Sequence, residues 1–249
     1  MKKQILIFAT VFTTLVFASC SKEIVEDPKT SLTKNEEIST SSSSSNRPYV
    51  DPLTIGLEGQ FEFNGNLKDQ TRQLADGSPS RRVPSYSADR KNNLKSALYL
   101  DGAYYVKLKG VPQQTNTSLS VWIKPKYLIN AGGSIVTSNL RGPRVLQQGD
   151  NLKGTMATDV STPGIDAGIY NTGWHHVVLT FDGTLFKMYL NNVLIESKPY
   201  TASITPKLYE YFLGWHEIWP SEFWNGYIDD LRFYSRTLSA SDVQKLYNL

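Results

Sequence analysis

The sequence predicts an all-β domain in which two antiparallel sheets pack face to face, closed by one short C-terminal helix. Three observations predict this class. Apolar and polar residues alternate in many short runs, clusters of Gly, Asn, Asp and Pro separate those runs, and no long helical period is present. Many short strands in a chain with 12% aromatic residues are typical of a β-sandwich.

The predicted strands are runs of strand length, each bounded by turn residues. In chain order they are Leu57–Phe63, Tyr104–Leu108, Leu119–Ile123, Val177–Phe181, Phe186–Leu190 and a strand around Phe212. No repeat of fixed period separates them, so the pattern indicates one domain rather than an array.

Turn and capping residues place the connections between the later elements. Asp182-Gly183 and Asn191-Asn192 each separate two strand-length runs, and both supply residues that tolerate positive φ, so two hairpins are expected. Ser239 is a favourable N-cap with Asp242 three residues on. We therefore predict one closing helix over Ala240–Tyr247.

The last predicted strand contains a change of phase. Leu231 and Phe233 share one strand face, whereas Ile228 falls on the other face if alternation is strict. A β-bulge at Asp229 and Asp230 would restore the register.

The N-terminus has the order of a secretory signal peptide. Lys2 and Lys3 precede an apolar run, Ile5–Phe17, which is too short to span a membrane. The small residues before Cys20 resemble a lipobox, where bacterial lipoproteins are cleaved and their new N-terminal cysteine is acylated, although Phe17 stands where Leu is usual. We predict a signal peptide over 1–19 and lipidation of Cys20, the alternative being an incidental thiol after a plain signal peptide.

Residues 20–50 are predicted to be a disordered tether, and 51–249 the folded domain. The tether is polar, with Ser39–Ser45 at its centre, and has too few apolar side chains to offset the entropy of ordering it. Its only membrane contact would be the acyl chains on Cys20. The charged residues of Lys22–Asp27 resemble export signals of Gram-negative lipoproteins, so an outer-membrane, surface-exposed location is expected; a merely solvated tail is the alternative.

Charge and cysteine content exclude some functions. The net charge is +3 for the whole chain, and removing Lys2 and Lys3 with the signal peptide lowers it to +1. No basic patch stands out, so nucleic-acid binding is not expected. A single cysteine allows no internal disulfide, so a folded region of about 200 residues must rely on its core.

Five segments form a combination that is more specific than any one of them. They are Phe63-Asn-Gly-Asn-Leu-Lys-Asp69, Ala97-Leu-Tyr-Leu-Asp-Gly102, Leu119-Ser-Val-Trp-Ile-Lys-Pro125, Gly173-Trp-His-His-Val-Val-Leu-Thr-Phe-Asp-Gly183 running on to Met188–Ile195, and Trp224-Asn-Gly-Tyr-Ile-Asp-Asp-Leu-Arg-Phe-Tyr234. In order and spacing they resemble the laminin G-like members of the concanavalin A-like superfamily, over roughly 51–249. The resemblance implies a jelly-roll β-sandwich that binds a partner. It does not fix the function, because this scaffold hosts lectins, adhesins, glycosidases and spacers.

The resemblance also raises the question of calcium, which related jelly-roll domains often hold as a structural ion. Asp69 lies beside the first strand and Asp230 in the last, and the terminal strands of this fold are neighbours. The two carboxylates are therefore candidate ligands for calcium, which takes oxygen ligands. The alternative is that Asp69 closes a turn and Asp230 forms hydrogen bonds at the bulge.

No set of catalytic residues is predicted, and an enzyme is not expected. Glycoside hydrolysis generally needs two carboxylic acids across the scissile bond. The glucanases of this superfamily carry Glu-x-Asp-x-(x)-Glu on one strand, and that run is absent; Glu217 and Glu222 lie in a loop around Pro220. No Gly-x-Ser-x-Gly elbow occurs. His175 and His176 are strand neighbours that point to opposite faces, so they are interpreted as scaffold residues rather than joint metal ligands.

The most unusual stretch is Tyr209–Trp224, which carries three of the five tryptophans within ten residues. Indole rings beside carboxylates and amides suit sugar recognition. The candidate ligand-binding residues are Trp215, His216, Glu217, Trp219, Glu222 and Trp224. The alternative, which weighs most for the last of these, is that the rings fold back over an open end of the sandwich, since aromatic side chains bury large areas.

These observations predict a non-catalytic, lectin-like domain of a lipid-anchored surface protein, with a glycan or polysaccharide as its ligand and no cofactor beyond structural calcium. Two alternatives stay open. One is an adhesin that docks a host or partner protein through a sheet face or the same aromatic loop, because large exposed aromatics also suit protein hot spots. The other is a glycoside hydrolase with a degenerate site.

Overall fold

Fifteen strands and one α-helix follow one another in the computed structural model, which describes residues 49–128 and 132–249. The helix is α1 (Ala240–Asn248), and a 3-10 turn, η1 (Pro52–Thr54), opens the domain. The strands are β1 (Leu57–Phe61), β2 (Ser78–Pro79), β3 (Ser85–Ser87), β4 (Ala97–Asp101), β5 (Val106–Gln113), β6 (Thr117–Pro125), β7 (Gly132–Ser138), β8 (Gly142–Gln148), β9 (Asn151–Ala157), β10 (Gly164–Ile169), β11 (His175–Phe181), β12 (Leu185–Leu190), β13 (Val193–Pro199), β14 (Lys207–Leu213) and β15 (Asn225–Tyr234). The signal peptide, Cys20 and the tether up to residue 48 lie outside the described residues.

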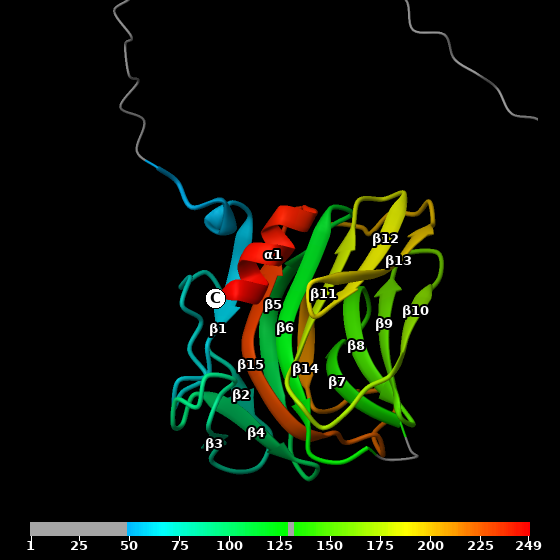
Figure 1. Cartoon of the computed structure of the whole chain (residues 1–249). Coiled ribbons are helices and arrows are strands. Elements are labelled where there is room, and N and C mark those ends of the chain that lie inside the picture. The colour runs from blue at the N-terminus through cyan, green and yellow to red at the C-terminus, as the bar shows by residue number, and fades with distance from the viewer. Residues whose placement is uncertain (1–48, 129–131) are drawn as a thin grey trace, which may run out of the picture. The chain divides into compact units, whose positions relative to one another are not determined.

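The strands form two antiparallel sheets, as predicted. One sheet has eight strands in the order β13-β12-β11-β6-β15-β4-β3, with β1 also paired to β15. The other has seven strands in the order β10-β9-β8-β7-β14-β5-β2. Figure 1 shows both sheets, with the β8, β9 and β10 strands of the seven-stranded sheet on the right. Neighbours distant in sequence, such as β6 and β15, make this a sandwich with crossover connections rather than a meander.

Side-chain alternation fills the space between the sheets. On β6 the inward residues Leu119, Val121 and Ile123 are completely buried, and they belong to one large apolar cluster that spans both sheets. On β8 and β9 the inward residues include Val145 and Leu152. The residues between them in sequence point to the outer faces of the sheets.

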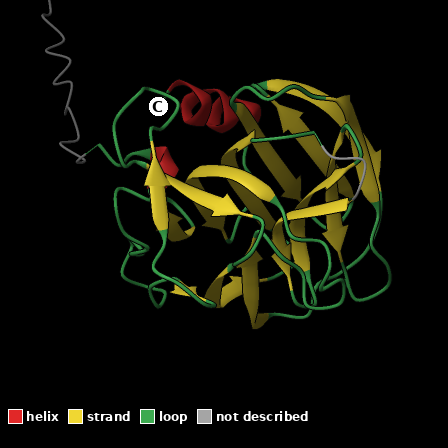
Figure 2. Cartoon of the chain, turned by 90° about the horizontal axis from the view of Figure 1, so that it is seen from below, coloured by secondary structure: helices red, strands yellow, loops and turns green. Residues whose placement is uncertain are grey.

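A second apolar cluster lies outside the sandwich. Leu246 and Val243 of α1 pack against Val178, Tyr189 and Tyr234 on the outer face of the eight-stranded sheet. Figure 2 shows α1 on the outside of the strands rather than between the sheets. The helix covers one end of this outer face, and Arg90 lies over Trp122 next to it.

The predicted connections are confirmed. The β11–β12 hairpin turns at Gly183 (φ 93°), and the β12–β13 hairpin turns at Asn191 and Asn192, with φ values of 50° and 66°. Helix α1 begins at Ala240, and Ser239 and Asp242 form a reciprocal capping box.

The predicted bulge is also present. The pairing of β15 with β6 shifts register between Asp229 and Arg232, and Asp230 has a positive φ of 44°. This extra residue returns Leu231 and Phe233 to the face of Ile228, and all three are completely buried.

Four consecutive strands, β7 to β10, were not predicted. Their sequences are rich in Gly, Ser, Thr and Gln, and β8 begins with Gly142 and Pro143 and contains the buried Arg144. Long-range pairing rather than alternation or propensity fixes these strands. In the described part of the chain, no helix is long and apolar enough to cross a membrane.

Candidate functional site

The aromatic loop connects β14 to β15 and lies on the outer face of the seven-stranded sheet. Trp224 N–H donates to the Gly214 carbonyl (3.0 Å), and Gly214 N–H donates to the Ile135 carbonyl of β7 (2.9 Å). These two backbone hydrogen bonds close the base of the loop and fix it to the sheet. The position of each residue along the loop then decides whether its side chain reaches solvent.

Trp215 anchors the start of the loop. Its indole stacks on the ring of Tyr105, with centroids 4.4 Å apart and planes 9° apart, and meets Phe212 edge-on at 5.2 Å. Its Nε1 donates to the Pro220 carbonyl (3.1 Å). Because one face of the indole rests on Tyr105 and its N–H is used within the loop, this side chain stabilises the loop conformation.

His216 lies beneath the loop and is completely buried. Its Nδ1 accepts a hydrogen bond from the Ile218 N–H (2.9 Å), and its ring centroid is 4.6 Å from that of Trp219. Burial, and to a lesser degree the positive charge of Arg144, lowers the pKa of His216 to about 4. The imidazole is therefore neutral and out of reach of a ligand, which corrects its predicted place among the ligand-binding residues.

Trp224 is also completely buried. The alternative prediction for this residue, that its ring packs into the sandwich rather than against a ligand, therefore holds. Its Nε1 donates to Gln147 Oε1 (3.0 Å), which also accepts from the Tyr170 hydroxyl (2.8 Å), while Gln147 Nε2 donates to the Gly149 carbonyl (3.1 Å). Trp224 cannot contact a ligand. It instead holds Gln147 and the β8–β9 turn in place.

Of the predicted ligand-binding residues, Trp219 and Glu222 line one common hollow. Trp219 keeps 42% of its surface exposed. Glu222 is fixed by its backbone, because its N–H donates to the Trp219 carbonyl (3.0 Å) and its carbonyl accepts from Ser134 N–H (3.3 Å). Its carboxylate lies against Gly132, where a Cβ would be only 2.9 Å from Glu222 Oε1. Glu217 is exposed and does not line this space.

We call this space the Trp219 hollow. It has a volume of about 350 Å³ and is lined by Gly132, Leu146, Gln147, Gln148, Gly149, Lys153, Trp219 and Glu222. Lys153 donates to the side-chain oxygen of Gln148 and lies 3.9 Å from an Asp166 carboxylate oxygen. A partly bare indole, a carboxylate, an amide and an ammonium therefore surround one hollow, and they offer both an apolar ring and polar groups of both signs.

Of the eight residues that line the Trp219 hollow, the sequence predicted Trp219 and Glu222 and missed the other six. Leu146, Gln148 and Lys153 face outward because Val145 and Leu152 face the core, and Gly149 (φ 61°) turns the chain between β8 and β9. The run of polar residues from Gln147 to Asn151 was a visible signal of a turn. Its position beside the aromatic loop depends on sheet order, which the sequence does not reveal.

The two strand histidines take the structural roles that were predicted. His176 is buried, its Nε2 lies 2.8 Å from the Ser120 hydroxyl, and burial lowers its pKa to about 3. His175 Nε2 lies 3.1 Å from the Asn171 carbonyl oxygen. Over residues 49–128 and 132–249, no group of three or more His, Cys, Asp or Glu side chains is arranged to hold a metal ion.

Asp69 and Asp230 do not fit a shared calcium ion. The Asp69 carboxylate accepts hydrogen bonds from the N–H groups of Gln60, Gln73 and Leu74, at 2.8–2.9 Å, and from the Thr71 hydroxyl. These donors outweigh the effect of burial and lower its pKa. The oxygens that a cation would use are therefore already engaged in closing a turn.

Asp230 is engaged in a different way. Its carboxylate forms a two-point ion pair with Arg232, with contacts of 2.7 and 3.2 Å, and a guanidinium nitrogen of Arg90 lies 3.6 Å away. Two positive side chains beside one carboxylate disfavour a divalent cation. The turn and bulge roles given as the alternative describe both aspartates.

Residues 100–244 match the family model described as the concanavalin A-like lectin/glucanases superfamily. No curated protein matches the chain.

Several solved structures share the fold. Domain 4 of AbnA, a GH43 extracellular arabinanase from Geobacillus stearothermophilus solved in complex with arabinotriose, superposes with a TM-score of 0.64 and 22% identity, covering 77% of this chain and 98% of that domain. The binding domain of botulinum neurotoxin serotype D gives a TM-score of 0.61 and 16% identity over 79% of this chain. The neurotoxin DC binding domain in complex with rat synaptotagmin II gives 0.58 and 15% over 78%. This chain spans about half the length of each neurotoxin domain, 52% and 51% respectively.

Proposed function

Because the chain belongs to the concanavalin A-like lectin/glucanases superfamily, we propose that its folded domain is a non-catalytic carbohydrate-binding module and that the Trp219 hollow is its glycan site. The observation that carries this proposal is the exposed indole of Trp219 at the edge of a polar hollow. The C–H face of a sugar ring packs on such an indole. The sugar hydroxyls donate hydrogen bonds to the Glu222 carboxylate and the Gln148 amide oxygen, and they accept from the Lys153 ammonium group.

The loop is organised in advance for this role. Trp215 and His216 are packed beneath it, and Pro220 accepts the hydrogen bond from Trp215. A loop that is already ordered loses little conformational entropy when a ligand binds. The likeness to a domain solved with arabinotriose is consistent with a site for short oligosaccharides, and arabinotriose is therefore the first probe to use.

Binding without hydrolysis is proposed from the carboxylates at the hollow. Hydrolysis generally needs two acids about 5–10 Å apart across the bond. Among the described residues that line the Trp219 hollow, Glu222 is the sole acid. Release of reducing sugar from an arabinan or glucan that the protein binds would contradict this part of the proposal.

Calorimetry of the full chain against a panel of oligosaccharides, starting with arabinotriose, tests the proposed site. Trp219→Ala removes the stacking surface and should weaken binding by about tenfold or more. Ile218→Ala is the matched control, because Ile218 is exposed on the same loop but does not line the hollow. A Trp219→Ala protein that keeps its full affinity would overturn the assignment of the site.

A protein partner is the second candidate, and one observation favours it. Ile218 and Trp219 expose 62% and 42% of their surfaces side by side at the tip of the loop. Adjacent exposed apolar side chains are also what a protein hot spot uses. Removing glycans from a captured partner separates the two functions, since a lectin then releases it and a protein-binding adhesin retains it.

We also propose that the domain is tethered to the outer membrane through acyl chains on Cys20 and is exposed at the cell surface. The support is the order of charged, apolar and small residues before Cys20 and the serine-rich stretch after it. A glycan-binding domain held on a tether of about 30 residues could reach roughly 30 Å from the lipid headgroups.

A further inference from the structure

We infer that the outer face of the eight-stranded sheet carries a second binding site, which takes an acidic polysaccharide. The site is a row of four side chains, Trp174, Lys124, Tyr227 and Tyr99, together with Lys126 at its side. It lies on the opposite sheet from the Trp219 hollow and does not depend on the function proposed for that hollow.

Strand register builds the row. Tyr227 of β15 pairs with Lys124 of β6 on one side and with Tyr99 of β4 on the other. His175 pairs with Ile123, so Trp174, the residue before it, lies next to Lys124. The buried residues Ile123, Ile228 and Leu98 face the core, and the row therefore faces outward.

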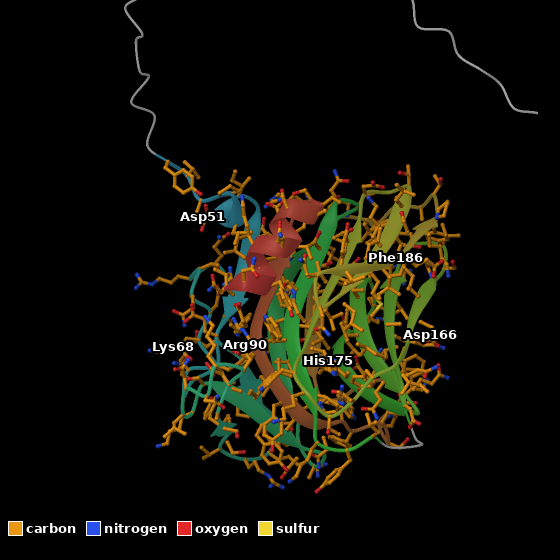
Figure 3. The ribbon with its side chains drawn as sticks, in the orientation of Figure 1. Asp51, Lys68, Arg90, Asp166, His175 and Phe186 are labelled. Atoms are coloured by element: carbon orange, nitrogen blue, oxygen red, sulfur yellow. The ribbon has the colours of Figure 1, made fainter. Side chains whose placement is uncertain are left out.

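The row lies on the part of the face that α1 leaves open. The helix packs on Val178 and Tyr234, toward the other end of the same strands. Figure 3 shows Arg90 and His175, which adjoins Trp174 in the sequence, below the helix. Trp174, Tyr227, Tyr99 and Lys124 are each only partly buried, and Lys126 is exposed.

Each ammonium group lies beside an aromatic ring of the row. Tyr99 and Tyr227 stack with their centroids 4.9 Å apart, Lys124 Nζ lies 5.7 Å from the Tyr227 ring centroid, and Lys126 Nζ lies 5.0 Å from that of Tyr99 and 2.8 Å from its hydroxyl oxygen. The single ring contact of Trp174 is to Tyr227, at 6.5 Å and tilted by 54°, so no ring in the described part of the chain lies flat on its indole.

The row carries two ammonium groups, those of Lys124 and Lys126. Neither Lys124 nor Lys126 forms an ion pair with any carboxylate of the described residues. Of the nearby acids, Asp229 pairs with Arg90. The Asp89 carboxylate, which lines a hollow beside the row, is oriented by hydrogen bonds from Lys91 N–H and from the backbone and side chain of Asn93.

A hollow of about 180 Å³ opens beside the row. It is lined by Ser87, Ala88, Asp89, Arg90, Asn92, Lys124, Trp174 and Tyr227. The hollow can take a carboxylate or sulfate group next to Lys124 while the sugar ring that carries it rests on Trp174. This combination favours a polymer that bears both anions and sugar rings, which is an acidic polysaccharide. A nucleic acid is a less favoured ligand, because proteins that displace counterions from nucleic acids use more lysine and arginine side chains than the two in this row.

Binding of polygalacturonate to the full chain, compared with its fully methyl-esterified form, tests this inference. The two polymers share one backbone and differ in charge. We expect polygalacturonate to bind with an affinity that falls as salt is added, and the neutral ester to bind at least about tenfold more weakly. Equal binding of both polymers, or no binding of polygalacturonate, would overturn the inference.

Variants locate the binding. Lys124→Gln together with Lys126→Gln should weaken binding by about tenfold or more, because each lost ion contact is a charged hydrogen bond. Lys109→Gln is the matched control, since Lys109 is exposed on β5 of the other sheet. Trp174→Ala should also weaken binding, whereas Trp219→Ala should not. Equal losses in the control, or binding of single-stranded poly(dT) as tight as that of polygalacturonate, would show non-specific charge attraction and contradict the site.

Discussion

Trp224 controls the shape of a site that it does not touch. Its buried Nε1 and the Tyr170 hydroxyl converge on Gln147 Oε1, and Gln147 in turn donates to Gly149 at the β8–β9 turn. Gln147 and Gly149 both line the Trp219 hollow. A core tryptophan therefore acts as a positioning residue for the proposed glycan site.

Trp224→Phe should destabilise the domain by about 1–3 kcal/mol, since it removes a buried hydrogen bond and part of a large buried side chain. Urea denaturation measures this loss. The same variant should bind arabinotriose more weakly under conditions in which it stays folded. A variant with wild-type stability would show that the buried hydrogen bond contributes nothing.

His216 makes the stability of the domain depend on pH. Its pKa is lowered to about 4 in the fold, so an unfolded chain, with a pKa near 6.5, takes up a proton that the folded chain excludes. The free energy of unfolding should therefore fall as the pH drops through this window.

His216→Asn keeps an acceptor for the Ile218 N–H and removes the titration. The stability advantage of the wild type over this variant should shrink by roughly 3 kcal/mol between about pH 7 and about pH 4. Chemical denaturation at several pH values measures it. A constant difference across the range would mean that His216 is protonated equally in both states.

At the scale of elements, the features that depend on local sequence could be predicted, whereas the strands that depend on long-range pairing could not. Asn191-Asn192, the Ser239 cap and the bulge at Asp230 each involve residues whose backbone or hydrogen-bonding preferences are local. Strand β8 gave no alternating signal because the polar Gln147 points inward to Trp224 and Tyr170, whereas the apolar Leu146 lines the outer hollow.

The site divides in the same way. The exposed Trp219 was predictable from an excess of aromatic residues in one loop. For Trp224, burial was already the favoured alternative. Which of Trp215 and Trp219 stays exposed was not predictable, because it depends on the packing of Trp215 against Tyr105 and Phe212 of the sheet.

The β12–β13 hairpin offers a direct test of turn chemistry. Asn192 has a φ of 66°, which a β-branched residue adopts only with strain. Asn192→Val should cost about 1–3 kcal/mol, whereas Asn192→Gly, the matched control, should be neutral or slightly stabilising. Thermal unfolding of the two variants measures the difference. Equal melting temperatures would contradict a positive φ at this position.

At the scale of the whole molecule, the domain presents two chemically different outer faces. One sheet carries the Trp219 hollow under the aromatic loop, and the other carries the row that contains Trp174, Lys124 and Tyr227. A domain with separate sites on its two sheets could hold two glycan chains, or two parts of one chain, at once.

The proposed membrane anchor is tested on the intact chain in a Gram-negative host. Cys20→Ser removes the acylated side chain and should abolish incorporation of labelled fatty acid and release the protein from the membrane fraction. The matched control, Ser19→Ala, keeps a small residue beside the cysteine and should leave both unchanged. Membrane retention of the Cys20→Ser protein would contradict anchoring through this residue.

The central claim is that sugar binds on Trp219, and a crystal structure of the protein with a bound oligosaccharide from the calorimetric panel tests it most directly. We predict a sugar ring packed on the Trp219 indole, with its hydroxyls hydrogen-bonded to Glu222 and Gln148. A sugar bound elsewhere on the domain, with the Trp219 hollow empty, would contradict the claim.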